Sequence, residues 1–287
     1  MTETTIEPTH GIVGPETTRS ADLPADRRAR LAGTCREWIA PVLLLGLLVG
    51  LWEVWSRWRD VPLWLLPPPS IIATTLVEDR GLLLQHTRVT LLEVLLGFAL
   101  ALVVGVTLGA AIDASTPLER AVYPLVIASQ TIPVIALAPL FLIWFGYGLL
   151  PKVLITALIG FFPIAVNTVD GLRQTDPDIL DLFRSLGASR WTRFRLAKLP
   201  SALPFIFSGA KIAVAVCVIG AVFGELFGSS QGLGYLLDRS MAQFLTARVF
   251  ASIALLSLMG ISLFALVALA ERLMMPWRHL EAERLSR

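Results

Sequence analysis

The sequence has little of the chemistry on which soluble catalytic sites depend. Its 287 residues include two cysteines, Cys35 and Cys217, and three histidines. Two cysteines this far apart form neither a disulfide framework nor a metal-binding motif. The histidines, His10, His86 and His279, fall outside the interior of the long apolar runs, so an intramembrane enzyme with a nucleophile–base pair or a metal centre is not expected. We predict a chain with no cofactor, no bound metal and no enzymatic activity of its own.

Charge is also scarce. Charged residues make up 16% of the chain and hydrophobic residues 55%, a balance that ordinary soluble domains do not have. The net charge of +2 gives no reason to expect a nucleic acid as partner. Several apolar runs can cross ~30 Å of hydrocarbon, which takes a helix of about 20 residues. The sequence therefore predicts an all-α integral membrane protein with six transmembrane helices, at Trp38–Val54, Leu91–Ile112, Val122–Phe145, Leu149–Val169, Leu203–Phe227 and Phe250–Leu273.

Proline and small residues indicate how these helices pack. Pro133 and Pro139 lie in the third run and Pro163 in the fourth, so both helices are expected to be kinked and held inside the bundle. Small residues recur at every fourth position of the second run, which permits close contact with another helix. They are Gly97, Ala101, Gly105 and Gly109.

The apolar runs divide the chain into four regions. Residues 1–37 are rich in Thr, Pro and charge and are expected to form a disordered tail without a secretory signal. Residues 38–65 are predicted to contain the first transmembrane helix, residues 66–278 a core domain with five more, and residues 279–287 a second tail. Lys and Arg are more numerous in the segments that are internal if the N-terminus is cytoplasmic. Both tails are therefore predicted to be cytoplasmic in a multi-pass inner-membrane protein.

The segment Asp181–Pro200, DLFRSLGASRWTRFRLAKLP, interrupts the apolar runs with a charged and helical pattern. Charge of this density cannot lie in hydrocarbon, so the segment is predicted to be a cytoplasmic loop. Gly187 and Pro200 are expected to divide it into a helix, a turn, a second helix and a stop. An amphipathic hairpin with several arginines is suited to docking on a partner, although an ordinary charged loop would have a similar composition.

At this segment the chain resembles the inner-membrane permease subunits of ABC importers. Their signature loop reads E-A-A, three residues, G, nine residues, I, one residue, L-P. Asp181 stands at the Glu position, Gly187, Leu199 and Pro200 match, Ala197 replaces Ile, and larger residues replace the two alanines. The resemblance implies that the segment, here called the candidate coupling loop, contacts the ATPase subunit. The residues implied in coupling are Asp181, Arg184, Ser185, Leu186, Gly187, Ala188, Arg190, Leu199 and Pro200.

Other segments resemble the nitrate, sulfonate and taurine branch of these permeases, including LPPPSI at Leu66–Ile71 and GSSQGLGYLL at Gly228–Leu237. The branch implies import of nitrate, a sulfonate, taurine or bicarbonate. Close relatives import neutral heterocycles such as thiamine-pyrimidine precursors or flavins, and the segment Ala210–Gly228 is nearer to that group. The resemblance also implies a homodimer, two copies of the ATPase, and a periplasmic or lipid-anchored solute-binding protein that docks near Gly228–Leu237.

Polar side chains within the apolar runs are candidates for a solute pathway, because polar groups are costly inside a membrane. Gln130 lies in the third run, Asn167 in the fourth, and Lys211 and Glu225 in the fifth, on roughly the same helix face. The alternatives are helix-to-helix hydrogen bonds for the first two, snorkelling for Lys211 and an exposed interfacial carboxylate for Glu225. A secondary transporter driven by an ion gradient is a further alternative, but paired mid-membrane charges and internal repeats are not evident.

Overall fold

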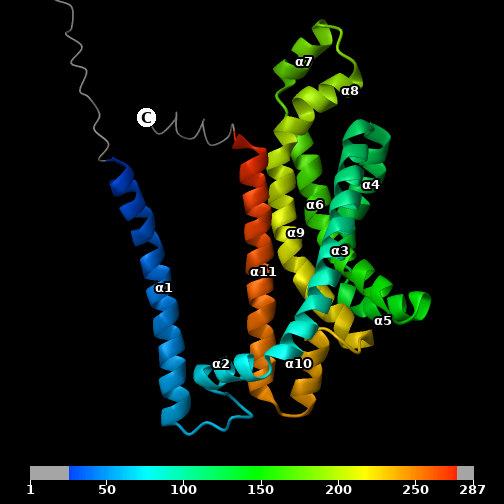
Figure 1. Ribbon diagram of the computed structural model, residues 1–287. Helices are drawn as coiled ribbons and strands as arrows, with labels where there is room; N and C mark the ends of the chain where they lie inside the picture. The colour runs from blue at the N-terminus through cyan, green and yellow to red at the C-terminus, as the bar shows by residue number, and fades with distance from the viewer. Residues whose placement is uncertain (1–25, 277–287) are drawn as a thin grey trace, which may run out of the picture. The chain divides into compact units, whose positions relative to one another are not determined.

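The computed structural model describes residues 26–276, with side chains from Ala40 onward, and its regular elements in that range are all helical (Figure 1). The predicted tail 279–287 and residues 1–25 of the predicted tail 1–37 lie outside the described residues. The elements are α1 (Asp26–Trp58), α2 (Pro69–Glu78), α3 (Arg80–Ala114), α4 (Thr116–Ser129), α5 (Val134–Phe145), α6 (Leu149–Arg173), α7 (Pro177–Ser185), α8 (Arg190–Arg193), the π-helical turn η1 (Phe194–Lys198), α9 (Leu199–Gly228), α10 (Leu233–Ala242) and α11 (Thr246–Met274).

The chain forms two units, one up to Trp52 and one from Glu53 onward. In the described residues the first unit consists of α1 as far as Trp52. This helix begins at Asp26 and so includes part of the tail predicted to be disordered. The part of α1 that is apolar enough to cross a membrane is Ala40–Trp58. This confirms the first predicted span, although the helix ends seven residues before the boundary predicted at residue 65.

The second unit contains the remaining membrane-length helices. In the described part of the chain, five helices are long and apolar enough to cross a membrane: α1, α3, α6, α9 with its preceding turns, and α11. The third predicted span is not one kinked helix, because α4 and α5 are separate helices bent by 100° at a short break. Pro133 ends that break as the residue preceding α5, where the absence of an N–H has no consequence. The total is six spans if this bent pair is counted as one broken span.

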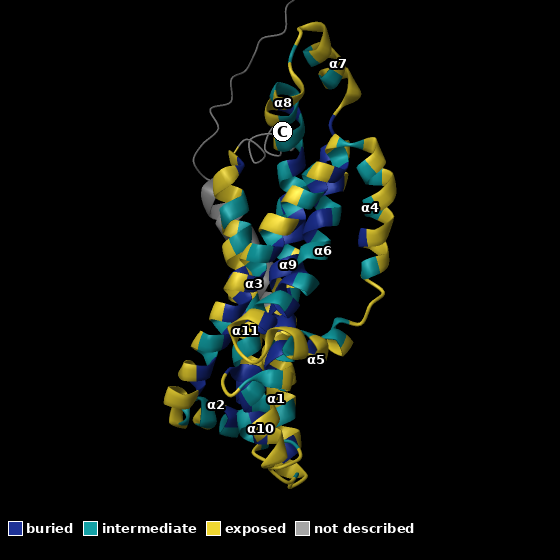
Figure 2. Cartoon of the chain, turned by 90° about the vertical axis from the view of Figure 1, so that its right-hand side faces the viewer, coloured by how far each residue is buried: buried dark blue, intermediate teal, exposed yellow. Residues whose placement is uncertain are grey.

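The centre of the second unit is formed by α3, α6 and α9, whose facing sides carry most of its buried residues (Figure 2). The row of small residues on α3 faces α6. A Cβ atom on Gly97 would lie 2.4 Å from Thr156 Cγ2, and one on Gly109 would lie 2.7 Å from Thr168 Cβ. The predicted close helix contact is therefore confirmed. The packing extends to α10 and α11 through a cluster that includes Val94, Val214, Cys217, Leu233 and Met259.

Candidate functional site

The candidate coupling loop projects from the end of the bundle at which α6 ends and α9 begins (Figure 1). Its two short helices are capped by side chains that accept backbone hydrogen bonds: Asp176 from the Asp178 amide, and Ser189 from the Thr192 amide. Between the helices, Gly187 has a φ of +71°, a conformation that residues with a Cβ atom rarely adopt. The predicted helix, turn and second helix are confirmed.

The predicted stop at Pro200 is wrong. Pro200 is the second residue of α9, and the segment Arg190–Gly228 forms a single run of 39 helical residues. The π-helical turn η1 precedes the proline and shifts the backbone pairing, so that the Leu199 amide bonds to the Phe194 carbonyl. A proline in the first turn after such a shift removes no required hydrogen bond. The second arm of the loop is therefore a direct extension of a membrane helix.

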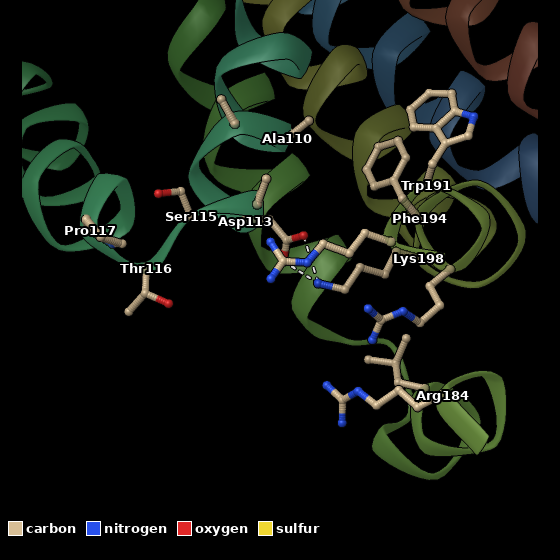
Figure 3. Close-up of a pocket in the computed structure, with 14 residues that line it drawn as sticks. Ala110, Asp113, Ser115, Thr116, Pro117, Arg184, Trp191, Phe194 and Lys198 are labelled. Atoms are coloured by element: carbon tan, nitrogen blue, oxygen red, sulfur yellow. Dashed lines mark hydrogen bonds and ion pairs between the residues drawn. The ribbon is translucent and has the colours of Figure 1, made fainter. Parts of the chain in front are cut away.

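A cavity of about 1150 Å³ lies between the candidate coupling loop and the corner that joins α3 to α4 (Figure 3). Its lining includes four basic side chains, those of Arg184, Arg190, Arg193 and Lys198, and one carboxylate, that of Asp113. Lys198 Nζ lies 2.8 Å from both carboxylate oxygens of Asp113. This ion pair ties the start of α9 to the end of α3, and the arginines give the cavity a positive charge.

The residues predicted to act in coupling divide into two groups. Asp181 and Arg184 form an ion pair on α7 in which both side chains are more than half exposed. Leu186 is 74% exposed and the neighbouring Trp191 is 67% exposed, so the hairpin leaves large apolar groups in water. Leu199 and the following proline belong instead to α9. The other predicted coupling residues all lie on the hairpin of α7, the turn and α8. They are Asp181, Arg184, Ser185, Leu186, Gly187, Ala188 and Arg190.

Three of the predicted pathway residues make separate contacts. Gln130 lies at the α4–α5 break and lines a cavity of about 270 Å³ against α6. The Asn167 side-chain amide donates to the Pro163 carbonyl of its own helix at 2.8 Å. Lys211 Nζ lies 2.7 Å from a carboxylate oxygen of Glu271 on α11. Lys211 therefore has a carboxylate partner, which the alternative of snorkelling did not include.

The fourth, Glu225, belongs to a buried polar cluster. Glu225 is 1% exposed, so the alternative of an exposed interfacial carboxylate is wrong. Its Oε1 accepts a hydrogen bond from Thr90 Oγ1 at 2.6 Å, and its Oε2 accepts one from the Gly234 amide. In the same cluster Lys152 on α6 forms an ion pair with Glu93 on α3. Four elements of the second unit, α3, α6, α9 and the start of α10, thus meet around this cluster.

Sequence reasoning did not include Glu93, Lys152 or His86 among the candidate site residues. Lys152 is 6% exposed and Glu93 is completely buried. His86 is buried in α3, where Nδ1 accepts a hydrogen bond from the Gly232 amide at 2.9 Å. One feature could have identified Glu93, because an acidic residue inside an apolar run needs a partner. The other two histidines lie outside the described residues.

The chain belongs to the family described as the inner-membrane component of binding-protein-dependent transport systems, whose model matches residues 97–276. It is 43% identical over 240 residues to the formylaminopyrimidine transport permease protein ThiX of Halalkalibacterium halodurans, covering 84% of this chain and 96% of that protein. It is 39% identical over 246 residues to the riboflavin transport system permease protein RibX of Chloroflexus aurantiacus, with coverages of 84% and 91%.

Identity to the taurine transport system permease protein TauC of Escherichia coli is 30% over 237 residues, with coverages of 80% and 86%. Among solved structures, an inward-facing form of the MetNI methionine ABC transporter aligns with a TM-score of 0.53 at 21% identity, covering 66% of this chain and 98% of that chain. The latter likeness concerns the fold. The protein is thus the permease of an ABC importer, a membrane component that carries out no enzymatic reaction, and its family implies an ATPase and a solute-binding protein as partners.

Proposed function

We propose that the candidate coupling loop is the seat of the ATPase, and that the chain works as a homodimer with two ATPase copies and with both termini in the cytoplasm. The observation that carries this proposal is the hairpin of α7 and α8, which extends beyond the membrane helices (Figure 1). It exposes Leu186 and Trp191 close in sequence to Arg184 and Arg190. Exposed apolar side chains combined with arginine are typical of surfaces that bind another protein.

The continuity of the loop with α9 supplies a route for movement. α9 has 30 residues, a length of about 45 Å at 1.5 Å per residue. When the ATPase dimer closes on ATP, it would push on the hairpin and so on the inner end of this helix. The Asp113–Lys198 ion pair would pass the push to α3. Two bundles moved in this way would alternate between inward-open and outward-open states.

The proposed orientation predicts which side of the membrane labels each end of the second unit. Ser185 lies on the candidate coupling loop, whereas Ser230 precedes α10 at the opposite end (Figure 1), and both residues are exposed. In a variant whose Cys35 is replaced by serine, Ser185→Cys is expected to react with an impermeant maleimide only from the cytoplasmic side. Ser230→Cys is expected to react only from outside. The reverse pattern would remove the loop from reach of the ATPase.

For the solute, we favour a neutral heterocycle over the small anions that the branch resemblance suggests. Identity to the permeases named for formylaminopyrimidine and riboflavin is 43% and 39%, against 30% for the taurine permease. A charge argument agrees, because each lysine of the chain has a carboxylate partner and none is left to attract an anion within the bundle. The pairs are Lys152–Glu93, Lys198–Asp113 and Lys211–Glu271.

Uptake by cells that express the permease with its ATPase and binding protein distinguishes the two solute classes. Labelled formylaminopyrimidine or riboflavin is expected to accumulate in an energy-dependent manner, and labelled taurine is not. Uptake of taurine alone would contradict the heterocycle proposal and restore nitrate, sulfonates, taurine or bicarbonate as the candidate solutes.

A further inference from the structure

The start of α10 is held by three hydrogen bonds from successive amides, those of its N-cap residue and of its first two residues. The amides of residues 232–234 donate to His86 Nδ1 at 2.9 Å, to Thr90 Oγ1 at 2.8 Å, and to Glu225 Oε2. Gly232 has a φ of +115°, and a Cβ atom there would lie 2.1 Å from the Glu225 carboxyl carbon. The backbone of this first turn therefore approaches the carboxylate more closely than a side chain would allow.

An ion pair lies behind this turn. Lys152 pairs with Glu93, and the exposed fractions of the two side chains are 8% and 0%. Lys152 also donates to Ser229 Oγ at 3.0 Å, just before the turn. Apolar residues of similar volume are often as stable as a buried ion pair, so such a pair suggests a role in specifying one arrangement of the helices. We call this group, with the turn at 232–234, the outer latch; its side chains are His86, Thr90, Glu93, Lys152, Glu225 and Ser229.

The helices that form the outer latch also form the base of the candidate coupling loop. α3 carries Glu93 in its first half and Asp113 in its last turn. α6 begins close to Lys152 and leads into the loop at its far end. α9 carries Glu225 near its last turn and follows directly after Lys198. One ion pair, Glu93–Lys152, therefore joins α3 to α6, and a second, Asp113–Lys198, joins α3 to the turn that leads into α9.

We propose that the outer latch makes α10 move with α3, α6 and α9, so that a movement of the candidate coupling loop reaches the outer face of the protein. Thr90 is the positioning residue at its centre, because its hydroxyl donates to Glu225 and accepts from the Leu233 amide. Since linkage is reciprocal, a partner that docks at α10 would alter the loop through the same contacts. This inference rests on the proposed seating of the ATPase on the loop.

Hydrogen exchange on the complex of permease and ATPase, with and without MgATP and vanadate, tests the inference. The informative variant is Thr90→Val, which keeps the size of the side chain and removes the hydroxyl. Thr90→Ser keeps the hydroxyl and is the matched control. A second control is Asp79→Asn, which breaks the 2.8 Å ion pair to Arg248 without touching the turn at 232–234.

In the wild type and in both controls, nucleotide is expected to change the exchange of amides in the candidate coupling loop and in α10. In Thr90→Val the change at α10 should fall about fivefold or more, within the usual range of coupling between sites, while the change at the loop remains. An unaltered response of α10 would overturn the inference. Loss of both responses would also overturn it, because Thr90 would then support the fold as a whole.

The proposed function fails in a different way, namely if nucleotide does not affect the loop amides of the wild-type complex. If Thr90→Val does not accumulate in the membrane, Ser229→Ala serves for the same comparison. It removes the hydrogen bond from Lys152 at the edge of the outer latch and the two that link the Ser229 hydroxyl to the backbone of Gln231. A weaker response of α10 in this variant would support the inference, and a response equal to that of the wild type would contradict it.

Discussion

Replacing Gly187 with valine is expected to leave the protein in the membrane at the wild-type level while uncoupling ATP hydrolysis from uptake. Gly187 has a φ of +71°, and a Cβ atom there meets nothing within 4 Å, so the effect arises from backbone strain and not from a clash. Strain of this kind costs on the order of 1–3 kcal/mol, which corresponds to a reduction in uptake of about fivefold to 150-fold if it misplaces the hairpin. Measuring both solute uptake and ATP hydrolysis by the complex in liposomes shows whether the two are still coupled.

Gly187→Asn is the matched control, because asparagine tolerates a positive φ better than other residues with a side chain. It should retain most of the coupled uptake. Full coupled uptake in Gly187→Val would show that the turn does not position the ATPase. Loss of the protein from the membrane in Gly187→Val alone would show instead that the turn is needed for folding.

The largest loss of stability is expected for Lys152→Met. This change leaves the carboxyl group of Glu93, which is 0% exposed, without its cation. Removing one partner of a buried ion pair costs about 3–5 kcal/mol. Lys211→Met is the matched control, because Lys211 and Glu271 are both partly exposed in their pair. Thermal unfolding in detergent should show a clearly larger decrease in melting temperature for Lys152→Met.

A double variant separates charge from packing. In Glu93→Gln with Lys152→Met, the buried carboxyl of the pair is removed together with its cation, so most of the lost stability should return. A double variant as unstable as Lys152→Met alone would mean that the lysine stem, and not its charge, supports the bundle.

The helices were largely predictable because long apolar runs have few alternatives to a membrane helix. Where prediction failed, a proline had more than one structural solution. Pro133 could have kinked a continuous helix but instead precedes a new one after a bend of 100°. Pro200 could have ended a helix but sits in its first turn after a π-helical segment. Contacts with neighbouring helices determine which conformation forms at each proline. The local sequence pattern does not indicate those contacts.

The functional residues show the same division between local and distant information. Gly187 and the caps at Asp176 and Ser189 follow from residues within a few positions of one another. The Glu93–Lys152 pair joins residues 59 positions apart, and neither helical periodicity nor charge counting relates them. Buried pairs of this kind become visible only when the helices are packed, which is why the predicted site contained Glu225 but not the residues around it.

The central claim is that the candidate coupling loop seats the ATPase on a paired permease. Native mass spectrometry of the detergent-solubilised complex tests it most directly, with the wild type compared with Leu186→Asp combined with Arg190→Glu. The wild type should have the mass of two permease and two ATPase chains, and the loop variant should keep the permease pair while losing the ATPase. A variant that retains both ATPase copies, or a wild type that contains a single permease chain, would contradict the claim.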